Sequence, residues 1–195
     1  MRGDYVCFRQ NPAELTGERV TAKALDDRAC VACLVEIARR LKEKALPFSV
    51  AFLCSDQEEL GGRGAAVSAF RLNPDSAVVL DVSFGDGPGI DPYECGKLGG
   101  GVMIGKSPLL DRRLSDKMVR LAAEKEIPYQ IEVMGGRTGT NGDRIAEVRD
   151  GVPTALLSVP LRNMHTDCEV VDLTDLASVC DLCTQYILAG GDSDD

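Results

Sequence analysis

Short apolar runs alternate with amphipathic helical segments along this chain, and this alternation constrains the fold more than any other feature. Three apolar runs, at residues 48–54, 77–82 and 154–159, are typical of strands that are covered on both faces. Three segments show helical periodicity, at residues 28–45, 110–126 and 173–188. Strands that alternate with helices predict an α/β fold, a three-layer sandwich around a largely parallel mixed sheet.

Weaker patterns complete the expected organisation. Further strands are predicted at residues 5–9, 18–21, 102–104 and 129–133, and shorter helices at residues 64–70 and 143–148. Asp172 or Thr174 is the expected N-cap of the last helix. The chain has 195 residues and no internal repeat or low-complexity linker, so we expect one main domain with a real core.

Composition excludes several classes of function. The formal net charge of −9 argues against nucleic acid and anionic membrane surfaces as partners. No apolar run approaches the ~20 residues of a membrane span, and the first residues lack the apolar region of a secretion signal. We therefore expect a cytoplasmic protein with reduced thiols. Two CxxC pairs, Cys30/Cys33 and Cys180/Cys183, lie in helical patterns, which favours buried thiols over zinc ligands.

Acidic residues stand at or just after these apolar runs. Glu58 and Glu59 follow residues 48–54, Asp81 follows four apolar residues, and the only histidine, His165, comes after residues 154–159. The pair Asp26 and Asp27 comes just before a predicted helix. Ligands of α/β sheets bind beyond the carboxyl ends of the strands, so we expect these side chains to gather at one edge.

These residue types suit a dinuclear metal hydrolase. Zinc binds histidine nitrogen and carboxylate oxygen, and two zinc ions ~3.5–4 Å apart share a bridging carboxylate and a bridging water. A carboxylate that binds no metal can take the proton of that water. Each residue alone has a simpler interpretation, since Asp26 or Asp27 could cap the helix and His165 could be an ordinary core or surface histidine. The combination at strand ends favours the site, and Asp81 is the least ordinary member because a buried carboxylate needs a partner.

Four motifs in order then resemble a known family. They are Ala24-Leu25-Asp26-Asp27-Arg28, residues 57–65 around Glu58-Glu59-Leu60-Gly61-Gly62, Leu80-Asp81-Val82, and residues 151–166 ending in Met164-His165-Thr166. Together they resemble the glutamyl aminopeptidase or TET-type family of zinc- or cobalt-dependent aminopeptidases. The resemblance implies a zinc-exopeptidase-like fold and hydrolysis of short peptides by a homo-oligomer. It also implies that Asp26 bridges two metal ions, Glu58 is the general base, Glu59 and His165 complete one metal site, and Asp81 binds the other metal.

The resemblance also implies a domain division and a departure. Residues 1–22 match the end of an inserted β-rich domain, residues 23–191 the C-terminal part of the catalytic domain, and residues 192–195 a frayed tail. The family's other histidine ligand lies in an upstream His-x-Asp motif, which has no match here because this chain has a single histidine. We therefore expect the C-terminal part of a longer enzyme lacking its N-terminal segment, at most one well-liganded metal, and little or no activity from this chain alone.

Two other functions compete with this interpretation. Residues 100–107, with Gly100, Gly105, Lys106 and Ser107, fit the phosphate-binding pattern GxxxxGK[ST] of nucleotide hydrolases. Residues 102–104 look like a strand inside that supposed loop, which argues against it. The single histidine favours a non-catalytic scaffold. The side-chain preference of the enzyme and the choice among zinc, cobalt and manganese stay open.

Overall fold

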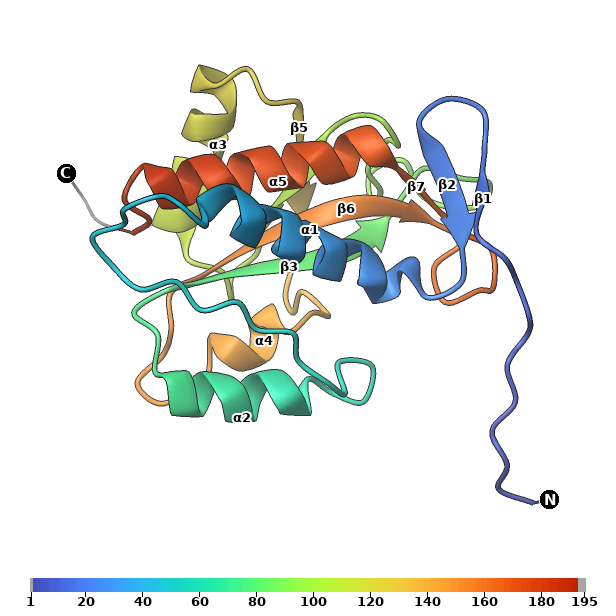
Figure 1. Cartoon of the computed structure of the whole chain (residues 1–195), viewed down its shortest axis with the longest axis horizontal. Helices are drawn as coiled ribbons and strands as arrows, with labels where there is room; N and C mark the ends of the chain where they lie inside the picture. Colours follow the sequence, from blue (N-terminus) through green and yellow to red (C-terminus); the bar gives the residue numbers. More distant parts are fainter. Residues whose placement is uncertain (1, 193–195) are drawn as a thin grey trace.

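The computed structural model describes residues 2–192 and shows a mixed sheet between two layers of helices (Figure 1). The strands are β1 (Ala13–Glu14), β2 (Arg19–Ala22), β3 (Ala77–Phe84), β4 (Val102–Lys106), β5 (Tyr129–Val133), β6 (Thr154–Arg162) and β7 (Glu169–Asp172). The helices are α1 (Leu25–Leu41), α2 (Arg63–Leu72), α3 (Arg112–Glu124), α4 (Gly142–Ile145) and α5 (Leu173–Leu188). The predicted α/β architecture is confirmed.

The sheet is organised around β6, which pairs with three strands, β3, β4 and β7. Its strand order is β1-β2-β7-β6-β4-β5, and β3 pairs with β6 outside that path. The two longest registers, β3 with β6 and β4 with β5, are parallel. The pairings of β6 with β4 and β7, of β7 with β2 and of β2 with β1 are antiparallel. All of β6 except its last residue is buried, as its continuous apolar sequence predicts.

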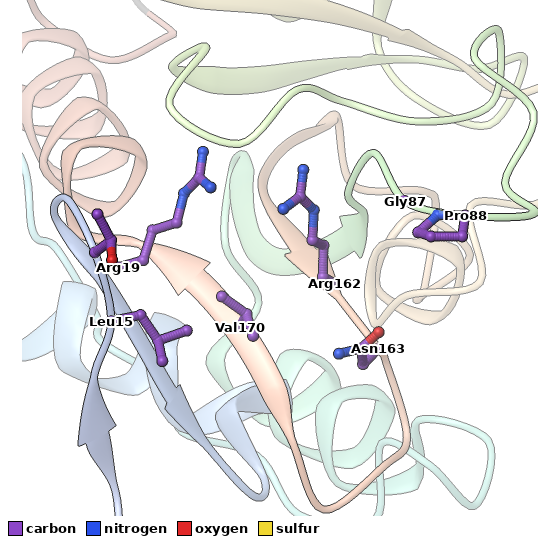
Figure 2. Close-up of a pocket in the computed structure, with 8 residues that line it drawn as sticks. Leu15, Arg19, Gly87, Pro88, Arg162, Asn163 and Val170 are labelled. Carbon is purple, nitrogen blue, oxygen red and sulfur yellow. The ribbon is translucent and has the colours of Figure 1, made fainter.

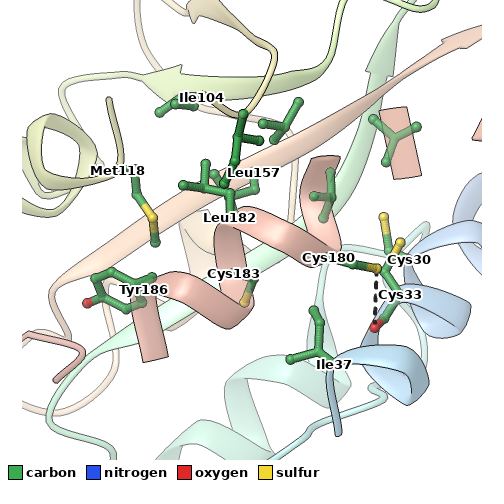
Figure 3. Packing of buried hydrophobic residues seen from close by; sticks show 14 of the residues in the cluster. Cys30, Cys33, Ile37, Ile104, Met118, Leu157, Cys180, Leu182, Cys183 and Tyr186 are labelled. Carbon is green, nitrogen blue, oxygen red and sulfur yellow. Dashed lines mark hydrogen bonds between the residues drawn. The ribbon is translucent and has the colours of Figure 1, made fainter. Parts of the chain in front are cut away.

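The two faces of the sheet carry separate hydrophobic clusters. One cluster joins α1, α3 and α5 to the sheet through residues such as Ile37, Met118 and Leu182 (Figure 3). The other joins α2 and α4 to the opposite face through Ala65 and Ile145. Alternate residues of β3 serve the two clusters, as the two-residue period of a strand requires.

The two CxxC pairs lie in the first of these clusters, between α1 and α5. Cys30, Cys33, Cys180 and Cys183 are all buried and free. The Cys180 thiol donates a weak hydrogen bond to the carbonyl of Cys33, at 3.8 Å (Figure 3). The predicted buried thiols are confirmed, and no cysteine belongs to a metal-ligand group within residues 2–192.

Local capping explains where two helices begin. The Asp172 side chain accepts a hydrogen bond from the amide of Thr174, which confirms Asp172 as the N-cap of α5. Asp111 caps α3 in the same way by accepting from the amide of Leu114. None of the helices in residues 2–192 is both long and apolar enough to cross a membrane.

Two strand predictions are wrong. Residues 48–54 form an extended loop, and no strand within the described chain pairs with them, although a strand needs a neighbour for its backbone hydrogen bonds. Phe48 and Phe52 are correspondingly 37% and 39% exposed. Residues 5–9 are also unpaired and exposed, and they extend away from the body of the molecule (Figure 1).

Other differences concern element boundaries. The helix predicted at residues 28–45 begins earlier, at Leu25, and ends at Leu41. Strand β7 was not predicted, because its four residues lie between a turn and a helix and are half acidic. Asp81 lies inside β3, which continues to Phe84, and does not end the strand. Of the predicted frayed tail, residues 193–195 lie outside the described part of the chain.

Candidate metal centre

The two adjacent aspartates at the start of α1 point to different partners. Asp26 and Asp27 have non-helical backbone angles, and the peptide bond between them is cis. The Asp27 carboxylate accepts a hydrogen bond from the amide of Cys30, at 2.9 Å, so Asp27 serves as the helix cap. The Asp26 carboxylate is turned toward His165 instead, which separates the capping interpretation from the ligand interpretation for this pair.

Three of the predicted site residues, Asp26, Glu59 and His165, lie together. The Nε2 atom of His165 is 3.1 Å from an oxygen of Asp26 and 3.4 Å from an oxygen of Glu59. One potential ligand atom from each residue lies within 4.8 Å of the other two. One imidazole nitrogen and two carboxylate oxygens at this spacing form the ligand set of a divalent cation such as zinc.

The two glutamates lie on a tight turn between the loop at residues 48–54 and α2. The amides of Gly61 and Gly62 donate to the carbonyl of Glu58, which closes the turn. Gly62 has a positive φ of 67°, and a Cβ atom there would lie 2.7 Å from Cγ of Arg144. Glycine is therefore required at this position, and the turn presents Glu59 to His165 with Glu58 beside it.

Asp81 and Glu58 complete the acidic surroundings. Burial and the nearby negative charge of Asp27 raise the pKa of Asp81 to about 8, and Glu58 and Asp26 add to that shift. Burial and the charges of Glu59 and Asp26 also raise the pKa of Glu58. Asp81 is therefore within electrostatic reach of Asp26 and Glu58, although neither Asp81 nor Glu58 belongs to the group of three candidate ligands. Carboxylates repel one another unless a cation lies between them, so the donor set fits a divalent metal ion.

A cavity of about 370 Å³ opens onto these ligands, and Asp26, Glu59 and His165 are part of its lining. A larger cavity of about 550 Å³ lies elsewhere, around Arg19 and Arg162, and contains none of the predicted residues (Figure 2). Both of its arginines are already paired, Arg19 with Asp172 and Arg162 with Asp86. The smaller cavity has the stronger case as a functional site, because the three grouped candidate ligands line it together.

The phosphate-binding pattern does not have the structure that its function needs. Val102–Lys106 form β4, an interior strand between β5 and β6. A phosphate-binding loop must instead be an irregular loop that leads into a helix. The match to GxxxxGK[ST] is therefore a coincidence of sequence.

Sequence reasoning missed one residue of this region, Glu169. It is only 2% exposed, and its carboxylate accepts hydrogen bonds from backbone amides on both sides of the site. The only signal was its place four residues after His165, which by itself predicts nothing, because most glutamates are exposed.

Comparisons with known proteins agree with this fold. The M42 glutamyl aminopeptidase family model matches residues 1–182. The chain belongs to this family, which confirms the resemblance carried by the four motifs.

The individual relatives are longer than this chain. It is 34% identical to a lysyl aminopeptidase of Pyrococcus furiosus over 169 residues, which are 87% of this chain and 48% of that protein. A structure of an aminopeptidase from the archaeon Desulfurococcus kamchatkensis is 33% identical, with a TM-score of 0.86 over 92% of this chain and 52% of that chain. The TET1 peptidase of Pyrococcus horikoshii, described as assembling into a tetrahedron or a large octahedral shell, is 31% identical with a TM-score of 0.79 over 92% of this chain and 53% of that chain. The chain thus spans about half the length of these relatives.

Proposed function

We propose that this chain carries the metal-binding and proton-transfer residues of an aminopeptidase that removes N-terminal residues from short peptides. One observation carries the proposal, the convergence of Asp26, Glu59 and His165 from three separate segments onto one point. Membership of the M42 family and the peptidase activity in the names of its relatives support it.

In this proposal, Asp26, Glu59 and His165 hold one divalent cation, and zinc, cobalt and manganese all suit these ligands. Asp26 faces a second position, for which Asp81 is the ligand from this chain. The only histidine is already used at the first position, so the second position has no imidazole from this chain. We therefore expect one well-liganded cation here and weak binding of a second.

The residues divide the chemistry between them. A bound divalent cation supplies Lewis acidity, which polarises the scissile carbonyl and lowers the pKa of a water molecule. Glu58 directly precedes the ligand Glu59 and is held by the same turn. Its carboxylate can therefore take the proton of the attacking water and deliver it to the leaving amine. The Asp26 carboxylate, with its side chain 11% exposed, lies 3.1 Å from the Nε2 atom of His165, so both groups can reach the same cation.

The proposal extends to the domain division, the cellular location and the assembly of the chain. We propose that residues 23–191 are the C-terminal part of the catalytic domain and that residues 1–22 close a preceding β-rich insert. The eight free cysteines support a cytoplasmic location. The assemblies described for the TET1 peptidase support a homo-oligomer, with short peptides as substrates.

Metal stoichiometry and hydrolysis of aminoacyl p-nitroanilides test the proposal together. We expect the metal-free chain to take up one tightly bound Co²⁺ or Zn²⁺ and to release p-nitroaniline very slowly or not at all. Any release should need the metal and should stop in Glu58→Gln, which keeps the ligands. No tight cation, or release that continues without metal, would contradict the assignment. Turnover at an ordinary enzyme rate would contradict the expected impairment.

A non-catalytic scaffold is the second candidate, and the lone histidine favours it. The same titration separates the two functions, because a scaffold that has lost its chemistry has no reason to retain a tight metal site.

A further inference from the structure

A single buried carboxylate joins the two backbone segments that carry Asp26 and His165. Glu169, the first residue of β7, accepts a hydrogen bond from the amide of His165 at 2.9 Å through one oxygen. Its other oxygen accepts from the amides of Leu25 at 2.7 Å and Asp26 at 3.1 Å. Glu169 is 144 and 143 residues away from Leu25 and Asp26 in the sequence but only four residues away from His165, so it joins two distant segments.

The amides of Leu25 and Asp26, which donate hydrogen bonds to Glu169, lie where the helix itself provides no acceptor. The first amides of a helix lack acceptors within that helix, and Ala24, which stands at the N-cap position of α1, provides no side-chain cap. The helical backbone angles are interrupted at Asp26, so the turn that carries this ligand is not held by the helix itself. Asp27 caps the regular part of α1 through the amide of Cys30, whereas Glu169, on strand β7, holds the irregular turn before it.

We call the three hydrogen bonds to Glu169 the clamp. Its His165 side also holds a backbone segment that has little other support. His165 has a φ of 62°, in the left-handed region that residues other than glycine rarely adopt. Its side chain is 63% exposed, so packing contributes little to holding it in this conformation. The hydrogen bond from its amide to the buried Glu169 therefore fixes where the imidazole is placed.

We propose that Glu169 is a positioning residue that sets the spacing between the Asp26 and His165 ligands through their backbones, without contacting the cation. This inference rests on the proposed function, because it assigns Glu169 to the metal centre proposed above. A carboxylate suits the task because three donors converge on it and both of its oxygens only accept. A glutamine offers one accepting oxygen, and its amide group would face a backbone N–H on the other side.

Calorimetric titration with Co²⁺ compares the wild-type chain with Glu169→Gln and with Asp172→Asn as a matched control. Asp172 lies on the same strand, is 7% exposed and carries the same charge, but its carboxylate caps α5 and does not contact the ligand segments. We expect Glu169→Gln to weaken Co²⁺ binding by about 10–100-fold and Asp172→Asn to leave it close to wild type. Unchanged binding in Glu169→Gln would overturn the inference, and so would equal weakening in both variants, which would show an effect of charge alone.

Amide hydrogen exchange in the metal-free wild-type chain tests the clamp without any variant. The amides of Leu25, Asp26 and His165 should exchange slowly, although they lie in turns or at a helix end. Rapid exchange at these three positions would overturn the inference even if Glu169→Gln fails to fold. Wild-type chain that shows this protection but binds no Co²⁺ would remove the proposed function and with it the assignment of Glu169 to a metal centre, whereas wild-type binding with unchanged binding in Glu169→Gln would remove only the role of Glu169.

Discussion

The two helical layers of this protein differ in how completely they are packed. On the side of α1, α3 and α5, large side chains such as Ile37 and Leu182 are fully buried. On the side of α2, Val67 and Phe70 are more than half exposed, and residues 48–54 lead into this layer without pairing to the sheet. The first layer has the properties of a domain core, and the second those of a thin cover.

The candidate metal centre takes ligands from both kinds of region. Asp26 and His165 are joined through Glu169 to the well-packed side, whereas Glu58 and Glu59 lie on the turn that leads into α2. Two different structures therefore hold the ligands in place: the buried clamp holds Asp26 and His165, and a surface turn holds Glu59. We expect the glutamate turn to be the adjustable half of the site.

Hydrogen exchange gives the largest contrast between the regions. Amides of β6 should exchange only through global unfolding, because the strand is buried and paired on both sides. Amides of residues 48–54 should exchange at least about a thousandfold faster, because nothing in the described chain pairs with them. Comparable protection in both segments, measured by NMR, would remove the distinction between the layers.

A pair of identical substitutions in the two layers sharpens the comparison. Leu182→Ala should lower the free energy of unfolding by about 2–5 kcal/mol, because Leu182 is fully buried in α5 and leaves a cavity. Leu72→Ala at the end of α2 should cost less than about 1 kcal/mol, because Leu72 is 50% exposed. Urea denaturation followed by circular dichroism measures both, and equal losses would contradict the contrast in packing.

A buried acid in the well-packed layer gives that layer a distinctive pH dependence. Asp175 is fully buried, and burial raises its pKa to about 6 although it accepts hydrogen bonds from the amides of Gly99 and Gly101. Its folded pKa is above the unfolded value of 3.8, so the native state binds the proton more tightly. The contribution of Asp175 to stability is therefore full below pH 3.8 and declines as the pH rises toward 6, by up to about 1.4 kcal/mol per pH unit.

Asp175→Asn removes this titration and isolates it from that of the other acids. Unfolding free energies of the wild type and the variant are measured by urea titration between pH 4 and 6.5. As the pH rises over this range, the wild type should lose stability relative to the variant. Parallel pH profiles would show that Asp175 has an ordinary pKa.

The smallest expected effect is in the thin layer. The guanidinium group of Arg149 lies 4.1 Å from the centre of the Phe70 ring and donates hydrogen bonds to the carbonyl of Phe70, which tethers α2 to the chain before β6. Both residues are exposed, so Arg149→Ala should cost about 0.5–1 kcal/mol in thermal or urea unfolding. A loss of several kcal/mol would mean that this layer is held as firmly as the other.

Sequence patterns predicted the parts of the fold in which local and global preferences agree. The apolar runs that became β3 and β6 and the amphipathic segments that became α1 and α5 were recognisable because their burial follows from their own periodicity. Residues 48–54 have the same apolar character but no strand beside them, and a single sequence does not reveal whether a strand will find a partner.

The site was predictable to a similar degree. The four motifs brought Asp26, Glu59 and His165 to attention, and these three meet in space, although of Glu59 and His165, which were expected to follow strands, only His165 does. The clamp by Glu169 was not predictable, because it depends on the approach of β7 to the start of α1, which is a property of the tertiary structure. The division of labour between Asp27 as cap and Asp26 as ligand likewise depended on backbone angles that the sequence left open.

The central claim is that one divalent cation binds among Asp26, Glu59 and His165. A crystal of this chain grown with Co²⁺ or Zn²⁺ and measured at the metal absorption edge tests it directly, because anomalous scattering locates the ion. The expected result is one strong peak about 2.0–2.2 Å from the Nε2 atom of His165 and from an oxygen of each of the two carboxylates. The claim would be contradicted by a map without a peak there, or with its only strong peak at another group of side chains.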